Sequence, residues 1–310
     1  MQSNPTGTLR IGTRGSPLAL VQAEAVRAAV VLASGLGADS IAIVPIRTSG
    51  DRITDRPLAE AGGKGLFTKE IDEALLDGRV DIGVHSAKDM ATRLPDGIAV
   101  AACLERNDVR DAFVSPSFAS LAELPPGAVV GTSSLRRRAL VLRMRPDLAV
   151  TDLRGNVETR LRKITDGEAH ATILAAAGLK RLGLAGRIAD FLDADTWVPA
   201  PGQGAIAIAA RANDEATRAL LARIDHRTTS QALAAERAFL SVLDGSCRTP
   251  IGGLARIDGE RLTLRGMIVK PDGSEAHERE GHGPVDDAEA IGRDVAAELL
   301  ARGGSGFFSG

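Results

Sequence analysis

Short apolar runs rich in β-branched residues alternate with amphipathic stretches of helical period through about the first two-thirds of the chain. This alternation is typical of α/β folds, in which helices connect the strands of mainly parallel sheets. The pair Ser16-Pro17 is typical of the start of a helix, and Gly78 of the end of one. A first α/β series is therefore expected, with strands at 9–11, 41–46 and 81–84 and helices at 17–33 and 68–76.

A second α/β series follows the turn formers Pro125-Pro126-Gly127. Its strands are expected at 129–130, 149–153 and 172–174, and its helices from Ser133 or Ser134 and at 156–167. Beyond Ile251 the pattern changes to strands separated by Asp-Gly turns, expected at 254–257, 261–269 and 275–280. This last part predicts an antiparallel three-stranded sheet covered by a helix at 288–300.

The charge balance excludes a general attraction to nucleic acid or to anionic membranes. The 38 Lys and Arg residues face 40 Asp and Glu residues, which leaves a formal charge of -2. Aromatic residues make up 3% of the chain and Tyr is absent, so the stacking platforms of single-strand binders are scarce. We therefore expect no nucleic-acid or membrane partner, and we expect any anion site to be local.

The N-terminal sequence and the cysteine usage predict a cytoplasmic protein. Residues 1–8 are polar and lack the basic start and apolar run of a secretory signal, and no apolar stretch is expected to approach the length of a membrane span. The two cysteines, Cys103 and Cys247, are expected to remain thiols because a reducing compartment disfavours a disulfide.

Two segments have the chemistry of anion sites. In the first, Thr132, Ser133 and Ser134 precede a helix that begins with Arg136 and Arg137. Helix N-termini attract negative charge, and guanidinium groups bind carboxylates or phosphates through two hydrogen bonds. The alternative is a capped helix with a solvated basic face. The second segment, Leu153 to Arg160, repeats the pattern, with Arg154 before an Asn cap.

Two glycine-rich segments resemble nucleotide-binding motifs only superficially. In Gly62-Gly63-Lys64-Gly65 the lysine is followed by Gly rather than by Ser or Thr, which argues against a Walker motif. No strand precedes Gly202-Gln203-Gly204, which argues against a dinucleotide fingerprint. The second segment is instead expected to mark a crossing between domains.

Two further residues are candidates for chemistry. The strand at 81–84 leads into His85-Ser86-Ala87-Lys88-Asp89, and ligands gather at the carboxyl ends of strands in open α/β sheets. A turn or cap residue is an equally good interpretation of Asp89. Cys247 lies in a loop of turn formers beside Arg248, where a reactive thiol and a buried structural cysteine are both possible. No second Cys or placed His completes a metal site, so none is expected.

Together these segments resemble the porphobilinogen deaminase family, also called hydroxymethylbilane synthase, in family order over nearly the whole chain. The segments are Thr13 to Leu20, the Gly62 loop, the His85 run, the Gly131 run, Leu153 to Arg160, Pro201 to Gly204 and the Cys247 loop. The resemblance implies two domains like those of periplasmic binding proteins, with mixed, mainly parallel sheets, and a smaller C-terminal α/β domain with an antiparallel three-stranded sheet. The implied domains are 1–104 with 205–222, 105–204, and 226–310.

The resemblance also implies the reaction, that of a transferase. A dipyrromethane cofactor is bound to Cys247 through a thioether, four porphobilinogen units are added to it, and hydrolysis releases hydroxymethylbilane. Asp89 is implied as the catalytic residue. It would stabilise the positive charge that forms as ammonia leaves the aminomethyl group, and an aspartate is ionised at neutral pH and suits this role.

The remaining site residues are carried over by the same resemblance, because each porphobilinogen brings an acetate and a propionate that need cations. Cofactor contacts are implied for Lys88, Thr132, Ser133, Ser134, Arg136, Arg137, Arg154 and Gln203. Substrate contacts are implied for Arg14, Ser16, Lys64, Arg154, Arg160 and Arg181. The sequence departs from the commoner family pattern at Gly15, Glu60, Glu158, Ser246 and Arg248-Thr249.

The family further implies a monomer that passes its product to uroporphyrinogen-III synthase. The sequence is also compatible with two other classes of protein. A non-catalytic binder of small polycarboxylates would share the two-domain architecture but would need neither Cys247 nor Asp89. An enzyme with a cysteine nucleophile would need a His partner, and none is recognisable in the sequence.

Overall fold

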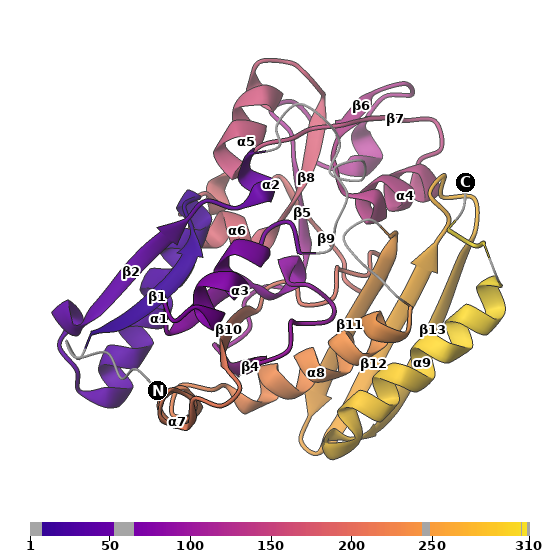
Figure 1. Ribbon diagram of the computed structural model, residues 1–310. Coiled ribbons are helices and arrows are strands. Elements are labelled where there is room, and N and C mark those ends of the chain that lie inside the picture. Colours follow the sequence, from indigo (N-terminus) through magenta and orange to yellow (C-terminus); the bar gives the residue numbers. More distant parts are fainter. Residues whose placement is uncertain (1–7, 53–64, 244–248, 305, 309–310) are drawn as a thin grey trace. The chain divides into compact units, whose positions relative to one another are not determined.

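The computed structural model describes residues 8–52, 65–243, 249–304 and 306–308 of the 310-residue chain (Figure 1). Its contacts divide the chain into two units. The described part of the first unit is 8–52, 65–106 and 205–230, and that of the second is 107–204 with the described residues from 231 onward. Lys64 and Cys247, both predicted to be functional, lie outside the described residues.

The first unit is built on a five-stranded sheet in the order β2-β1-β3-β10-β4. β1 pairs in parallel with β2 and β3, whereas β10 runs antiparallel to β3 and β4. The strands are β1 (Leu9–Arg14), β2 (Ile41–Ile46), β3 (Ile82–Ser86), β4 (Ile98–Cys103) and β10 (Ile206–Arg211). The helices are α1 (Pro17–Ser34), α2 (Ser49–Arg52), α3 (Lys69–Leu76) and α7 (Glu215–Ala222), with short 3-10 turns η1 (Ala38–Ser40) and η2 (Ala87–Asp89).

Helix α1 packs on this sheet, and its start and end follow the sequence prediction. Ser16 caps the helix by accepting a hydrogen bond from the amide of Ala19, and Gly35 ends it with a φ of 74°. Its residues Ala23, Val26 and Val30 are fully buried in the core of the first unit.

The same helix corrects one expectation. Of the described helices, α1 alone is long and apolar enough to cross a membrane by length and composition, although no such stretch was expected. Its alanine and valine content raises the mean hydropathy, while Glu24 and Arg27 form an ion pair on its outer side. Because one face packs on the sheet, we interpret α1 as a core helix of this unit.

The second unit contains a five-stranded sheet with the corresponding order, β7-β6-β8-β5-β9. β6 pairs in parallel with β7 and β8, and β5 runs antiparallel to β8 and β9. The strands are β5 (Asp111–Val114), β6 (Val129–Gly131), β7 (Ala149–Thr151), β8 (Ala171–Ala175) and β9 (Asp190–Leu192). The helices are α4 (Leu135–Met144), α5 (Val157–Thr165) and α6 (Ala176–Arg181), with 3-10 turns η3 (Leu121–Glu123) and η4 (Ala185–Arg187).

Each five-stranded sheet receives its antiparallel strand shortly after the chain enters that unit. β5 begins at Asp111, soon after the entry at 107, and β10 begins at Ile206, directly after the return at 205. At Gly204 the φ is 88°, and a Cβ atom would lie 2.5 Å from the carbonyl oxygen of Asn107. Only glycine meets both conditions, because larger residues disfavour this φ and would overlap the backbone.

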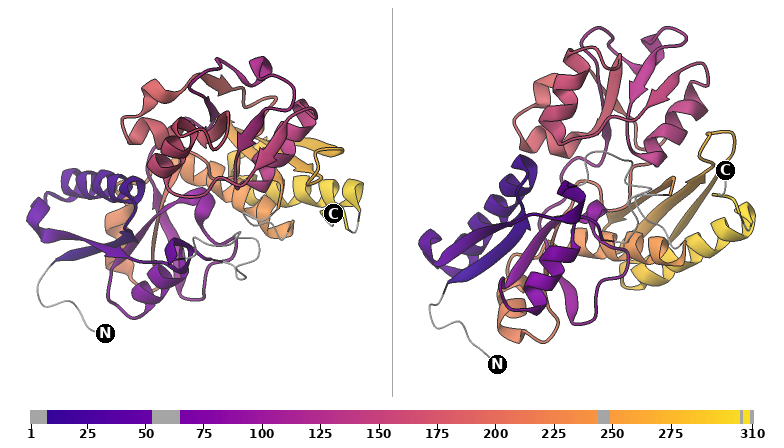
Figure 2. Two further views of the ribbon diagram at one scale, coloured as in Figure 1. Left: turned by 90° about the horizontal axis from the view of Figure 1, so that it is seen from above. Right: turned by 45° about the horizontal axis from the view of Figure 1, so that its top comes forward.

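The C-terminal part of the second unit is an antiparallel sheet in the order β11-β12-β13. Its strands are β11 (Ile251–Asp258), β12 (Arg261–Val269) and β13 (Ala276–Pro284). Helix α8 (Arg227–Val242), which belongs to this unit from residue 231 onward, and helix α9 (Ala288–Gly303) complete this part, with the 3-10 turn η5 (Val285–Asp287) before α9. Figures 1 and 2 show α9 running along the sheet, and Phe239 of α8 shares a core with Leu264 and Val295. The predicted antiparallel sheet covered by a helix is confirmed.

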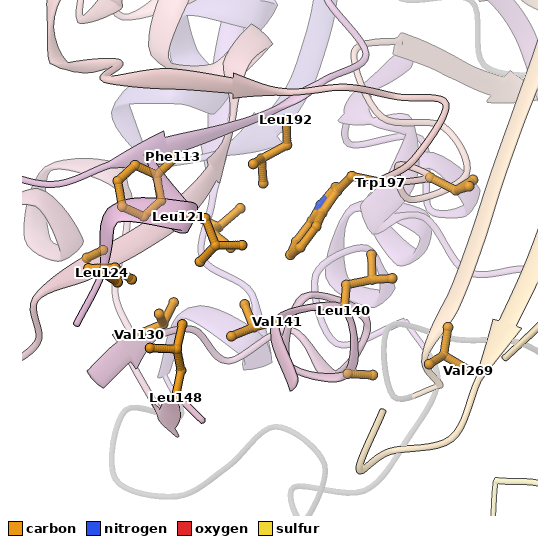
Figure 3. Close-up of a cluster of buried hydrophobic side chains, with 14 of the residues drawn as sticks. Phe113, Leu121, Leu124, Val130, Leu140, Val141, Leu148, Leu192, Trp197 and Val269 are labelled. Atoms are coloured by element: carbon orange, nitrogen blue, oxygen red, sulfur yellow. The ribbon is translucent and has the colours of Figure 1, made fainter. Parts of the chain in front are cut away.

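A second core lies between the sheet of β5 to β9 and helix α4 (Figure 3). Phe113, Leu140 and Trp197 are buried there, and Met267 and Val269 of β12 extend the same core. The predicted fold class, two mixed and mainly parallel sheets with a small antiparallel sheet, is therefore confirmed. The proposed division into three domains stays a prediction.

We predict that Gly292→Ala destabilises the protein, although Gly→Ala inside a helix usually stabilises by about 1 kcal/mol. A Cβ atom at Gly292 of α9 would lie 2.2 Å from the carbonyl oxygen of Ala235 in α8. Overpacking of this kind costs about 1 to 3 kcal/mol. Urea denaturation followed by circular dichroism measures the change.

The matched control is Gly186→Ala, since no atom lies within 4 Å of the added Cβ there. We expect this variant to stay within about 0.5 kcal/mol of the wild type. A Gly292→Ala variant as stable as the wild type would contradict the close approach of the two helices.

Candidate active site

Asp89 lies at the carboxyl end of the first unit's sheet. β3 ends at Ser86, and the turn η2 carries Asp89 directly after it, while Arg14 ends the neighbouring parallel strand β1. Both side chains are half-buried and line one pocket. The other lining residues are Ser16, Leu18, Ala19, Gln22, Phe67, Thr68, Val84, His85 and Ser86. Adjacent parallel strands thus bring the two predicted residues together, as expected for ligand sites in such sheets.

The two charged side chains of this pocket differ in their partners. The Nε atom of Arg14 donates to Asp51 at 3.1 Å, and its guanidinium carbon lies 4.2 Å from the centre of the Phe67 ring. Burial disfavours the ionised form of Asp51, but the hydrogen bonds from Arg14 and Thr48 outweigh it and lower the pKa of this carboxyl. Among the described residues, the Asp89 carboxylate forms no hydrogen bond or ion pair. Among the described residues the pocket therefore carries an uncompensated negative charge, which suits a cationic ligand.

Hydrogen bonds fix the wall of this pocket. Ser16 uses its hydroxyl to cap α1, and the side chains of Gln22 and Ser86 are hydrogen-bonded at 2.9 Å, which ties α1 to the end of β3. Lys88, predicted to contact the cofactor, lies half-buried beside Asp89 in η2. The predicted residues of the first unit that the structure describes are therefore neighbours on one edge of its sheet.

In the second unit the hydroxylated residues before α4 shape the turn that starts this helix. Ser134 is the N-cap and accepts from the amide of Arg137, and Thr132 accepts from the amide of Ser134 at 3.2 Å. Ser133 donates to the carbonyl of Leu153 at 3.0 Å. These contacts place the arginines that follow on the first turn of the helix.

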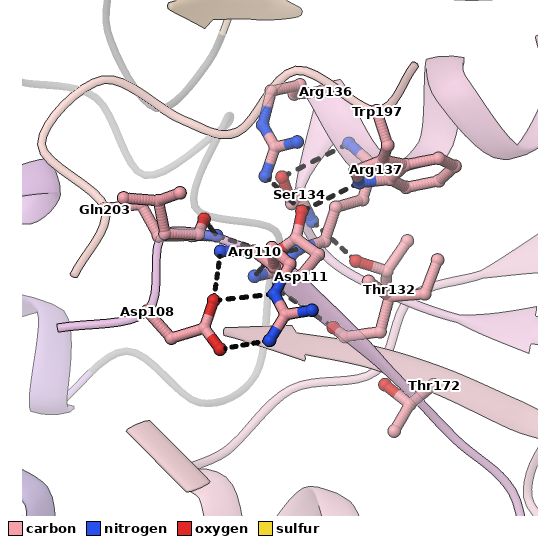
Figure 4. A network of polar contacts seen from close by, with 12 residues as sticks. Asp108, Arg110, Asp111, Thr132, Ser134, Arg136, Arg137, Thr172, Trp197 and Gln203 are labelled. Carbon is pink, nitrogen blue, oxygen red and sulfur yellow. Dashed lines mark hydrogen bonds and ion pairs between the residues drawn. The ribbon is translucent and has the colours of Figure 1, made fainter. Parts of the chain in front are cut away.

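Arg136 and Arg137 point into the protein and share the carboxylate of Asp111 on β5 (Figure 4). Both ion pairs have N···O distances of 2.7 Å, and the two arginine side chains are only 4% and 6% exposed. Burial alone would disfavour the ionised form of Asp111, but the two guanidinium groups hold its pKa well below the usual value. The solvated basic face, the alternative interpretation of this segment, is therefore wrong for these two residues.

This cluster fits a further anion. Two guanidinium groups against one carboxylate leave a net positive charge, and the Nε atom of Arg136 is buried without a hydrogen-bond partner among the described residues. Gln203, also predicted to contact the cofactor, is fully buried and donates to Asp111 and to the carbonyl of Val109, each at 2.9 Å.

The other predicted arginines of the second unit lie at helix ends and turns. Arg154 precedes Asn156, which caps α5 by accepting from the amide of Thr159, and Arg160 lies on the first turns of α5. Arg181 ends α6 and donates to the carbonyl of Gly204 at 2.8 Å, and burial lowers the pKa of its guanidinium. All three are half-buried.

The residues that contact and orient the predicted arginines were not identified from the sequence. Asp111 and Asp51 neutralise arginines, and Phe67 stacks on Arg14. A signal existed for Asp111, because a single acidic residue heads the apolar strand Asp111–Val114, and a charge at such a position needs a partner. No comparable local signal marks Phe67.

The fold and these two sites define an α/β protein with candidate sites for charged small molecules. Residues 9–219 match the family model "Porphobilinogen deaminase, dipyromethane cofactor binding domain", and residues 230–301 match "Porphobilinogen deaminase, C-terminal domain". The chain belongs to the porphobilinogen deaminase family, as the motifs predicted.

Known relatives cover nearly the whole chain. It is 56% identical over 299 residues to the porphobilinogen deaminase of Nitrobacter winogradskyi, covering 96% of this chain and 95% of the relative. It is 53% identical over 305 residues to that of Paracoccus denitrificans, covering 98% and 97%. Similar solved structures include a putative methionine-binding lipoprotein from Bacillus subtilis, with a TM-score of 0.44 and 14% identity, covering 72% of this chain and 92% of the other.

Close to the first unit's pocket, α3 carries a buried carboxyl that predicts a pH dependence of stability. Asp72 is 3% exposed, its Oδ1 atom has no hydrogen-bond partner among the described residues, and burial raises its pKa to about 6. The folded state therefore binds this proton more tightly than the unfolded chain does. The free energy of unfolding falls as the pH rises from about 4 to about 6 and stays lowered above it.

We predict that Asp72→Asn raises the free energy of unfolding by about 2 kcal/mol at pH 7.5, since the variant has no charge to bury there. It should also flatten the change in stability between about pH 4 and 6, measured by thermal melts across this range. Asp77→Asn, an exposed position at the end of the same helix, is the control and should leave the profile unchanged. An unaltered profile for Asp72→Asn would show that Asp72 does not titrate abnormally.

Proposed function

We propose that Asp89 is the catalytic carboxylate of porphobilinogen deamination in this chain and that Cys247 carries the dipyrromethane cofactor. The reaction follows from the family: a transferase joins four porphobilinogen molecules in sequence, and hydrolysis releases hydroxymethylbilane. The observation that carries the role of Asp89 is its carboxylate, which has no counterion among the described residues and lines a pocket at the carboxyl ends of the parallel strands β1 and β3.

Asp89 acts through charge. Positive charge develops on the aminomethyl carbon and its pyrrole ring as ammonia leaves porphobilinogen. A carboxylate that is already in place and has no other cation to neutralise stabilises that charge without reorganisation. Arg14 is paired with Asp51, so it does not compete for Asp89 and keeps N–H groups for a substrate carboxylate.

Members of this family bind dipyrromethane, and the second unit supports a place for its carboxylates. When bound, the cofactor supplies the pyrrole α-carbon from which the chain grows. Arg136 and Arg137 supply the surplus positive charge of the Asp111 cluster, and the buried Nε atom of Arg136 has no acceptor in the part of the chain that the structure describes. Thr132, Ser133 and Ser134 fix the turn that presents these arginines.

Chain growth adds two carboxylates with each porphobilinogen, so further cations are needed. We assign this role to Arg14, Arg154, Arg160 and Arg181, with Lys64 as a further candidate. A guanidinium at about 4 Å from a carboxylate gains roughly 4 kcal/mol at an effective dielectric of 20, before desolvation is subtracted. Charge-assisted pairs of this kind hold substrate without taking part in bond making.

We predict that Asp89→Asn lowers the rate of ammonia and hydroxymethylbilane release by roughly a hundredfold to a thousandfold, because the neutral amide does not compensate the developing charge. Both products are measured with protein whose cofactor content is known from its intact mass. Asp96→Asn, an exposed aspartate of the same unit, is the control and should stay within about twofold. A fully loaded Asp89→Asn variant with wild-type rates would exclude this role for Asp89.

A second prediction concerns attachment. Cys247→Ala should remove the added mass of dipyrromethane and abolish product release, because no thiol remains to form the thioether. Cys103→Ala should keep both, since Cys103 is fully buried at the end of β4. Intact-mass spectrometry of the purified proteins decides the point, and an unmodified wild-type protein with full activity would rule out attachment through Cys247.

The cellular setting belongs to the same proposal. We infer from the family resemblance and the composition that the chain works in the cytoplasm as a monomer and passes its product to uroporphyrinogen-III synthase. Sedimentation of the loaded protein at the mass of one chain, 32.2 kDa, would support the monomer.

A further inference from the structure

Asp111 has no capacity to bind a ligand itself. Five N–H groups donate to its carboxylate, from Arg136, Arg137 (two), Trp197 and Gln203. A carboxylate offers about four lone-pair sites, so these donors saturate it. Its side chain is 0% exposed, which also removes it from any contact with substrate. Its function must be exerted through the groups that it holds.

The groups that Asp111 holds are the guanidinium groups of Arg136 and Arg137. Arg137 uses Nη1 to donate to the carbonyl of Ile173, and Arg136 uses Nη1 to donate to the carbonyl of Val198, each at 2.9 Å. The Nη2 atom of each arginine donates to the carboxylate of Asp111. The orientation of both arginines is thus set within the protein before any ligand binds. No described residue accepts from the Arg136 Nε atom, so this atom and the surplus positive charge remain for a ligand.

We propose that Asp111 is a positioning residue that holds Arg136 and Arg137 in the orientation required by the cofactor carboxylates. The proposal rests on the proposed function of these two arginines. Preorganised binding groups are effective because a displacement of about 1 Å can cost a hundredfold. Without the Asp111 carboxylate, the two buried guanidinium groups repel each other and must turn towards other acceptors or solvent.

Trp197 provides a direct reporter of this contact. It is the single tryptophan of the chain, Tyr is absent, and its indole N–H donates to Asp111 at 2.8 Å while the ring is 1% exposed. Its fluorescence therefore reports on the Asp111 carboxylate without interference from other indoles or phenols. Any variant that disturbs the cluster should shift this emission.

The test compares Asp111→Asn with Asp108→Asn in the full-length protein. Asp108 pairs with Arg110 and Lys180 in the same unit but touches neither Arg136 nor Arg137, so it is a matched control. We expect Asp111→Asn to shift the emission of Trp197 and to lower the ratio of cofactor-loaded to unloaded protein, measured by intact mass, by about tenfold to a hundredfold. Asp108→Asn should change neither quantity. Normal loading of a folded Asp111→Asn variant would overturn the proposal.

A double-mutant cycle separates positioning from a purely structural role. If Asp111 acts through Arg136, the two substitutions should not be additive. The double variant Asp111→Asn with Arg136→Lys should then have nearly the same loading ratio as the single variant with the lower ratio. If the fold-decrease in the loading ratio of the double variant equals the product of the two single decreases, the proposal is overturned. If Arg136→Lys and Arg137→Lys both bind the cofactor normally, the proposed function of the two arginines is wrong. If these two variants lose the cofactor but Asp111→Asn keeps it, only the positioning role of Asp111 is refuted.

Should Asp111→Asn not fold, Asp111→Glu keeps the charge and displaces the carboxylate by one methylene. We expect this variant to fold, with a shifted Trp197 emission and a loading ratio lowered about tenfold. Wild-type loading of Asp111→Glu would overturn the proposal.

Discussion

Two arginine side chains can be buried at the start of α4 because one carboxylate lies between them. An isolated buried charge costs several kcal/mol, and Asp111 compensates Arg136 and Arg137 at the same time. The Nη1 atom of Arg136 donates to the carbonyl of Val198, and the Nη1 atom of Arg137 donates to the carbonyl of Ile173 in β8. Arg136 and Arg137 therefore join α4 to β5, to β8 and to the segment at Val198, and the proposed anion site depends on their ion pairs with Asp111.

The candidate sites of the two units have local surplus charges of opposite sign among the described residues, and under the proposed function each suits a different part of the substrate. In the first unit Arg14 is neutralised by Asp51, so the pocket retains the negative charge of Asp89. In the second unit the Asp111 cluster retains a positive charge. Porphobilinogen has the complementary distribution, since its reacting carbon becomes cationic while its acetate and propionate groups are anionic. Under the proposed function, the substrate therefore supplies the counterions of these two described sites.

The elements that were predicted correctly carry local signals. Ser16, Ser134 and Asn156 cap their helices as expected, and the Asp-Gly turns separate the strands of the antiparallel sheet. The strands β4, β5, β9 and β10 were not predicted. In β4 and β10, alanine-rich runs that are largely buried have no period that distinguishes a strand from a helix. β5 and β10 are also antiparallel insertions that follow chain crossings, and no local pattern specifies such long-range pairing.

The sequence by itself determined the family, the fold class and the candidate residues, because long motifs, helix caps and turn residues act over a few neighbouring positions. Only the tertiary structure decided which charge meets which. Asp111 is 25 positions from Arg136 and 86 from Trp197, and Arg14 is 37 from Asp51. Pairing over such separations arises from the packing of whole sheets and helices, so the same arginine motif is compatible with a solvated face or with a buried cluster until the strand carrying Asp111 is in place.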